Sequence, residues 1–194
     1  MGWYGMWGLL PVRPETVERY GPLLRSAIDE ERQLPASREL LREWHARGSG
    51  RWACDAFTEA AGPGALDGRI EVVYEAWEAG RDDGEPRVVV LCRKAFPAAA
   101  LAYAMGPQRF SLLPGWFGDL VLTPAQVRAS LPRVERAFTW TAAERADAER
   151  LLTEALRGDP DRADLDALLD GVPPVWRAAA RGGFGLLGAQ LLPS

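Results

Sequence analysis

The chain has 194 residues, of which 47% are hydrophobic and 26% are charged, and its formal net charge is −4. These proportions are close to globular averages, so they exclude a wholly disordered chain, and we expect residues 1–194 to form a single globular domain. The acidic balance also argues against a nucleic-acid-binding protein, which usually carries a basic surface.

Cysteine and lysine usage indicates a cellular setting. The only cysteines are Cys54 and Cys92, too few for a disulfide framework, so a reducing cytoplasm is the expected compartment. Arginine dominates the basic residues and Lys94 is the only lysine, which suggests a GC-rich bacterial genome. No apolar run approaches the roughly 20 residues that span a bilayer. We therefore expect a bacterial cytoplasmic protein that binds neither membranes nor nucleic acid.

The opening segment, MGWYGMWGLL, is predicted to form a strand. Read with period two, both of its faces are apolar, which is typical of a strand buried on both sides. Gly5 and Gly8 would allow close approach of another backbone or a large ring. The pattern therefore places both Trp3 and Trp7 in the interior.

The region up to residue 79 has apolar residues at helical spacing. We expect Gly21-Pro22 to interrupt a first helix that starts at Pro14, and Ser37 to cap a later helix that carries Trp44. The helical patterns in this region cover residues 14–20, 23–28, 37–47, 51–61 and 66–79. In the last of them, Ile70, Val73, Tyr74 and Trp77 form an inward stripe opposite Glu71, Glu75 and Glu78.

Short strands and further helices are predicted for the rest of the chain. Residues 87–93 contain VVVLC, which favours a buried strand, and residues 118–122 form a second short strand. Thr123 with Gln126, and Thr141 with Glu144, have the spacing of capping boxes at helix starts. The remaining elements are helices over residues 97–105, 163–170 and 174–181 and a strand over residues 184–192.

Together these elements predict a mainly helical α+β single domain with a small, mostly antiparallel sheet. The N-terminal and C-terminal strands are expected to be adjacent and antiparallel in that sheet.

Two motifs resemble ligand sites but lack the required context. Gly183, Gly185 and Gly188 match G-x-G-x-x-G, but a helix precedes them, whereas a dinucleotide site needs a preceding strand and a following helix. The aspartates between 159 and 170 resemble a calcium loop without its glycine. We interpret the glycines as part of a closely packed strand and the aspartates as solvated helix residues.

His45 is the only histidine, so the chain has three cysteine and histidine residues in total, fewer than the four that structural zinc usually needs. A dyad of His45 with Cys54 or Cys92 is conceivable, but packing explains both thiols. We assign no catalytic residue, no metal ligand and no cofactor.

Aromatic residues are the most distinctive feature of the composition. The eight tryptophans fall mostly on predicted inward faces, where core packing explains them. Trp116 and Phe117 lie in a glycine-rich loop instead. Because exposed loop aromatics often mark interfaces or ligand walls, a ligand cleft or partner surface is predicted near Trp116.

Three segments resemble the YfbM-like family of small bacterial proteins. They are the start at Met1-Gly2 with Gly5, the LTPAQVRASL segment at residues 122–131, and the helix and glycines at residues 176–183. The family supplies no established activity, so the resemblance implies no catalytic residue here.

Two functional hypotheses follow. The first is a non-catalytic binding or interaction domain with an accessory or immunity-type role, whose partner is another protein or a second copy of the chain. The alternative is a small-molecule-binding protein or enzyme with an aromatic-lined cleft that uses His45 and nearby carboxylates. The candidate ligand- or partner-binding residues are Trp44, His45, Trp52, Asp55, Arg109, Trp116, Phe117 and Asp119.

Overall fold

The computed structural model describes residues 2–48, 53–80, 84–157 and 160–193. It shows an α+β domain in which helices surround one antiparallel sheet, so the predicted fold class is confirmed. In chain order the elements are β1 (Tyr4–Val12), α1 (Pro14–Gln33), α2 (Pro35–Arg47), α3 (Cys54–Ala61), the 3-10 turn η1 (Asp67–Arg69), α4 (Ile70–Gly80), β2 (Val88–Arg93), α5 (Pro97–Phe110), β3 (Leu120–Leu122), α6 (Pro124–Ala137), α7 (Ala142–Ala155), α8 (Arg162–Asp170), α9 (Val172–Gly182) and β4 (Gly185–Leu191).

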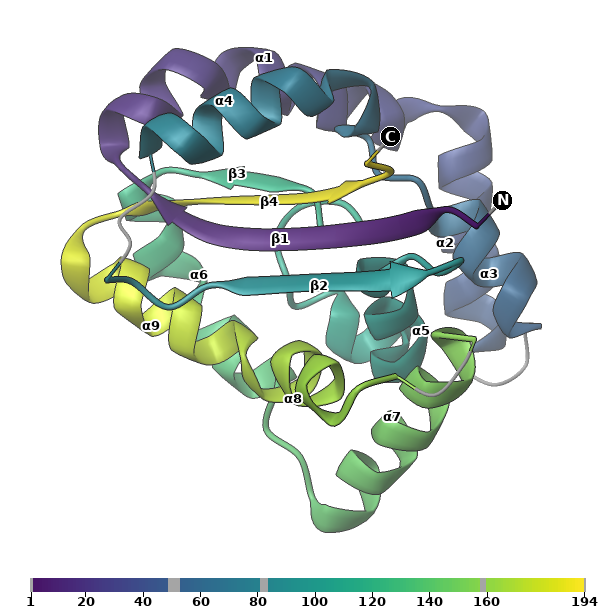
Figure 1. Ribbon diagram of the computed structural model, residues 1–194. Helices are drawn as coiled ribbons and strands as arrows, with labels where there is room; N and C mark the ends of the chain where they lie inside the picture. The colour runs from purple at the N-terminus through teal and green to yellow at the C-terminus, as the bar shows by residue number, and fades with distance from the viewer. Residues whose placement is uncertain (1, 49–52, 81–83, 158–159, 194) are drawn as a thin grey trace.

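The sheet has the strand order β2-β1-β4-β3, and all neighbours are antiparallel. The first and last strands are adjacent and antiparallel, as the sequence predicted. They are the two central strands of the sheet and pair from Met6↔Leu191 to Val12↔Gly185. Figure 1 shows them side by side in the middle of the domain. Every residue of β4 is buried. Of the glycines in the G-x-G-x-x-G match, Gly185 and Gly188 belong to this strand, whereas Gly183 is the left-handed C-cap of α9.

Helices cover the two faces of the sheet unequally. On one face α1 and α4 contact β1, β3 and β4, whereas α5, α6, α8 and α9 pack on the other face and reach all four strands. Figure 1 shows α1 and α4 on one side of the sheet and α5, α8 and α9 on the other. Since α1 and α4 pack mainly on β1, β3 and β4, and Val89 and Leu91 of β2 are exposed, the outer part of one sheet face lacks a helical layer. Within the described residues, no helix is both long enough and apolar enough to span a bilayer.

The first helix is longer than the sequence predicted. α1 runs through Gly21 and Pro22 without a break, whereas an interruption was expected there. A proline inside a helix removes one backbone hydrogen bond. Here Val17, Leu24 and Ile28 are buried along one side of the helix, and we attribute its continuity across Pro22 to this packing.

The start of α2 also differs from the prediction. Its N-cap residue is Leu34, and Pro35 holds the first turn. Ser37 lies inside the helix, and its hydroxyl donates to the Glu31 carboxylate of α1 at 2.8 Å. The serine thus joins two helices instead of capping one. By contrast, both predicted capping boxes are confirmed, at the starts of α6 and α7.

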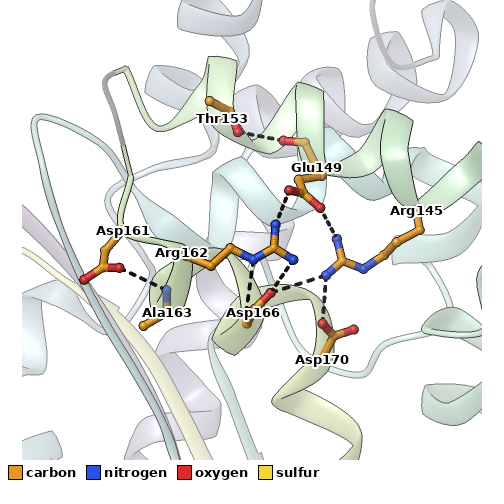
Figure 2. Close-up of polar contacts among 8 residues, drawn as sticks. All are labelled: Arg145, Glu149, Thr153, Asp161, Arg162, Ala163, Asp166 and Asp170. Carbon is orange, nitrogen blue, oxygen red and sulfur yellow. Dashed lines mark hydrogen bonds and ion pairs between the residues drawn. The ribbon is translucent and has the colours of Figure 1, made fainter.

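An ion-pair network joins α7 to α8 and explains the acidic run that resembled a calcium loop (Figure 2). Arg145 pairs with Glu149 at 2.9 Å and with Asp170 at 2.7 Å, while Arg162 binds Glu149 and Asp166. Asp161 caps α8 by accepting the Ala163 N–H at 3.2 Å. These carboxylates hold α8 against α7, and α8 in turn packs beneath β2.

The two indole rings of the opening segment have different environments. Trp7 is buried, and its Nε1 atom donates to the Gly118 carbonyl at 3.0 Å. Trp3 is 39% exposed, and its ring packs against that of Phe96 with centroids 4.8 Å apart. The prediction that both rings lie in the interior is therefore wrong for Trp3. It precedes β1, and its ring packs against Phe96, the residue before α5, at the margin of the core.

β2 is an edge strand and not the fully buried strand that its composition predicted. Its residues alternate between buried Val88, Val90 and Cys92 and exposed Val89, Leu91 and Arg93. The buried set faces α5 and α8, because these helices pack on β2. The exposed set faces the side that no helix covers, so Val89 and Leu91 are each 52% exposed.

Candidate functional site

An aromatic cleft lies where the sequence predicted one, between α2 and the segment that links α5 to β3. Its volume is about 180 Å³. The residues that define its character are Arg32, Trp44, His45, Phe110, Trp116 and Phe117. Four of the eight candidate residues, Trp44, His45, Trp116 and Phe117, therefore meet at one place.

The inner wall of the cleft is a stack of rings around Trp44. Its ring centroid lies 5.0 Å from that of Phe57 and 5.6 Å from that of Phe117, and Phe110 stacks on Phe117 at 5.6 Å. Such pairs add about 0.5–1.5 kcal/mol each beyond the burial of their area. The wall is thus continuous with the hydrophobic core.

A tight turn places Trp116 and Phe117. The backbone N–H groups of Trp116 and Asp119 exchange hydrogen bonds with each other's carbonyls at 2.8 and 2.9 Å. Gly118 has a φ of +98°, which favours glycine because it lacks a Cβ atom. The sequence suggested that these loop aromatics are exposed, but both rings are buried. They border the cleft as parts of the core.

His45 is exposed at the rim of the cleft, one residue beyond the buried Trp44. Asp55 and Arg109 lie elsewhere. Asp55 pairs with Arg157 at 3.0 Å, and Arg109 binds Glu144 at 2.6 Å with its guanidinium 4.4 Å from the Trp140 ring centroid. Trp52, also a candidate, lies outside the described residues.

Asp119 is fully buried and serves the fold. Its Oδ1 atom accepts the Gln190 N–H at 2.7 Å, and its Oδ2 atom accepts the Leu66 N–H at 2.9 Å. Burial raises the pKa of this carboxyl to about 7, although the backbone N–H donors favour its charged form. Asp119 does not line the cleft, so the acid–base arrangement of His45 with Asp119 is not formed.

Both thiols are buried in the core. Burial raises the pKa of Cys54 to about 11 and that of Cys92 to about 12, so each is a protonated thiol at neutral pH. Residues 2–48, 53–80, 84–157 and 160–193 contain no cluster of three or more histidine, cysteine or acidic side chains placed to hold a metal ion.

A second surface feature was not found by sequence reasoning. On the uncovered sheet face, exposed or half-buried apolar side chains of β1, β2 and α4 gather into one area, which we call the sheet patch. It consists of Tyr4, Met6, Tyr74, Val89 and Leu91.

Strand register explains how the sheet patch forms. Met6 lies opposite Leu91 and Tyr4 lies opposite Arg93, and directly opposite residues share a face. Gly8 lies opposite Val89, and a Cβ atom on Gly8 would come 2.7 Å from the Trp77 ring. α4 therefore sits directly on the sheet at Gly8 and leaves the strand residues beyond it uncovered. Tyr74, predicted to point inward, is 42% exposed at this border.

Comparisons with known proteins do not assign the chain to a family. No protein-family model, no curated protein and no solved structure matches it. The resemblance to the YfbM-like family therefore stays a prediction.

Proposed function

We propose that this protein is a non-catalytic interaction domain that binds a protein partner through the sheet patch. The observation that carries the proposal is the half exposure of two aliphatic side chains, Val89 and Leu91, on a sheet face that α4 covers only in part. Monomeric proteins usually cover or charge such sheet surfaces, because exposed contiguous apolar area promotes association.

The arrangement of reactive groups supports binding rather than catalysis. A nucleophile needs a base within hydrogen-bond reach. Cys54 and Cys92 are buried and protonated, whereas His45 is exposed at the aromatic cleft. Asp119, the carboxyl with the raised pKa, is enclosed by the backbone groups that it binds.

A matched pair of surface variants tests the proposal. Leu91→Glu places a charge in the sheet patch, while Leu23→Glu does the same on α1, where the leucine is 47% exposed. Each protein would be immobilised, and proteins retained from the native host would be quantified. We expect Leu91→Glu alone to lose a retained partner. Equal retention by both variants, or no partner for the wild type together with a strict monomer by light scattering, contradicts the proposal.

The aromatic cleft supports a second candidate function, the binding of a small aromatic anion. Four predicted residues meet there, and Arg32 supplies a positive charge beside the rings. A thermal-shift series with benzoate and indole-3-acetate tests this, because a ligand that binds only the folded state raises the melting temperature. The shift should disappear in Arg32→Gln. Absence of any shift with the wild type rejects this candidate and leaves the interaction function intact.

A further inference from the structure

We propose that the outer edge of β2 receives an extended segment of a partner protein as a fifth strand, with alternating apolar residues and a carboxylate opposite Arg93. This inference rests on the proposed function and names the class of partner that the sheet patch takes. Strand addition to a free sheet edge is a common way in which folded domains bind peptides.

The direction of the backbone groups of β2 follows from one hydrogen bond. The Lys94 N–H donates to the Trp3 carbonyl at 2.9 Å, next to the Tyr4↔Arg93 pair. Bonded and unbonded pairs alternate along an antiparallel ladder. Val89, Leu91 and Arg93 therefore direct their N–H and C=O groups away from β1. In the part of the chain that the structure describes, β2 pairs with β1 alone, so these groups form an open edge.

The side chains at this edge determine which residues suit the added strand. Val89 and Leu91 point to the uncovered sheet face, and residues opposite them on the added strand would share that face. Apolar side chains at those two positions would extend the sheet patch. The alternate side chains would point to the other side of the sheet. A groove of about 590 Å³ adjoins the C-terminal half of β2, and Leu91, Arg93 and Leu156 are among its lining residues.

A positive charge at one end of β2 determines which residue suits the third outward position of the added strand. Arg93 is exposed beside Lys94, and neither side chain forms an ion pair with any described residue. Asp161 and Asp164 line the same groove as these two cations. Asp161 caps α8, and Asp164 is partly buried. A carboxylate on the added strand, two positions beyond the apolar pair, would lie opposite Arg93 and stabilise the pairing.

The same charges disfavour a second copy as the occupant. Two copies that pair through the outward-pointing groups of β2 can centre on Val90 or on Leu91. Arg93 of one copy then lies opposite Arg87 or Val89 of the other, and neither residue is a carboxylate. A second copy therefore lacks the opposite-charge pair that stabilises neighbouring strands. We therefore assign the edge to a different protein, and a homodimer becomes an outcome of the test.

The experiment uses two labelled hexapeptides, ETVTVT and its charge-reversed counterpart KTVTVT, with fluorescence anisotropy as the readout. In antiparallel pairing, the first residue of each peptide lies opposite Arg93 and the two valines lie opposite Leu91 and Val89. We expect the wild type to prefer ETVTVT by on the order of tenfold, and Arg93→Glu to reverse that preference.

A backbone variant separates strand addition from simple surface attraction. Val89→Pro removes an N–H that points to the open edge and leaves the ladder to β1 intact, whereas Val89→Thr keeps the N–H. Val89→Pro should abolish binding of ETVTVT, while Val89→Thr should retain most of it. If Val89→Pro does not fold, the charge reversal in Arg93→Glu remains decisive, because that side chain is exposed.

Three outcomes overturn the proposal. They are no binding of ETVTVT at millimolar concentration, binding that is insensitive to Val89→Pro in a folded protein, and a wild-type dimer that Val89→Pro dissociates, which assigns the edge to a second copy. Failure here is distinguishable from failure of the proposed function. If the peptides do not bind but Leu91→Glu still loses a retained partner, the sheet patch binds by another geometry.

Discussion

The Oδ1 atom of Asp119 lies 2.7 Å from the backbone nitrogen of Gln190, a residue 71 positions later in the chain. The other carboxylate oxygen accepts the Leu66 N–H at 2.9 Å, so one buried side chain joins the turn before β3, the turn before α4 and the central strand β4. The side chain of Gln190 in turn accepts the N–H groups of Ala98 and Ala99 at the start of α5.

Substitution of this carboxylate tests its structural role. Asp119→Asn keeps the shape but turns an NH₂ group toward a backbone donor, so at least one buried N–H loses its acceptor. We expect the free energy of unfolding to fall by about 1–3 kcal/mol. Urea unfolding followed by circular dichroism measures the loss. A variant as stable as the wild type would show that these bonds contribute nothing net to the fold.

The pH dependence of stability provides an independent check on Asp119. Burial raises its pKa from 3.8 to about 7, so between these values the folded protein keeps a proton that the unfolded chain releases. This contribution to stability is present at acidic pH and is lost as pH rises toward 7. The stability difference between the wild type and Asp119→Asn should therefore change across this window in urea titrations. A difference that is constant with pH would contradict the raised pKa.

The contribution of Glu144 to stability should change with pH in the opposite direction to that of Asp119. The Thr141 N–H and the Arg109 guanidinium lower the pKa of this carboxyl from 4.5 to about 2. Its contribution is present above pH 4.5 and is lost as pH falls toward 2. Glu144→Gln should be less stable than the wild type at neutral pH, and thermal unfolding should show the two converging in acid. An unchanged gap at acidic pH would count against the ion pair.

These two carboxyls show what sequence could and could not establish. The capping box that contains Glu144 is a local pattern of four residues, so spacing alone identifies it. The sequence predicts a ligand-binding role for Asp119, because nothing near it in the sequence reveals its partners 53 and 71 positions away. Local signals predict the capping-box starts of α6 and α7, although not the start of α2, whereas long-range packing determines which polar groups are buried.

Strand β2 and the opening segment also show that long-range packing determines which residues are buried. A run of valines predicts a strand but does not specify its neighbours, so Val89 and Leu91 were expected to be covered on both sides. The prediction for Trp3 is wrong for the same reason, since its burial depends on the distant residues beside it, such as Phe96, and not on its own segment. The central position of β1 and β4 was predictable, because both segments are apolar on both faces.

Collisional quenching distinguishes the two tryptophans of the opening segment. Trp3 is 39% exposed and Trp7 is 4% exposed. Replacing Trp3 by phenylalanine should remove a quenchable part of the fluorescence, whereas Trp7→Phe should leave the acrylamide-accessible fraction nearly unchanged. Equal effects of the two substitutions would contradict the different burial of the rings. Circular dichroism of both variants controls for unfolding, because Trp7→Phe also loses the bond to Gly118.

Thiol reactivity tests the inert state of the cysteines. With pKa values of about 11 and about 12, Cys54 and Cys92 carry almost no thiolate at neutral pH. Ellman's reagent should label neither thiol rapidly in the folded protein and both after denaturation in urea. Rapid labelling of a single thiol in the native state would instead indicate an accessible nucleophile and would support an enzymatic function.

The central position of β4 has a consequence for biosynthesis. A ribosome completes β1, β2 and β3 before it makes the strand that joins β1 to β3. Until then β3 has no partner strand and β1 exposes one long edge, so the nascent chain cannot close its sheet. A stall or truncation before residue 185 would leave an aggregation-prone intermediate, and folding must wait for the arrival of the final strand.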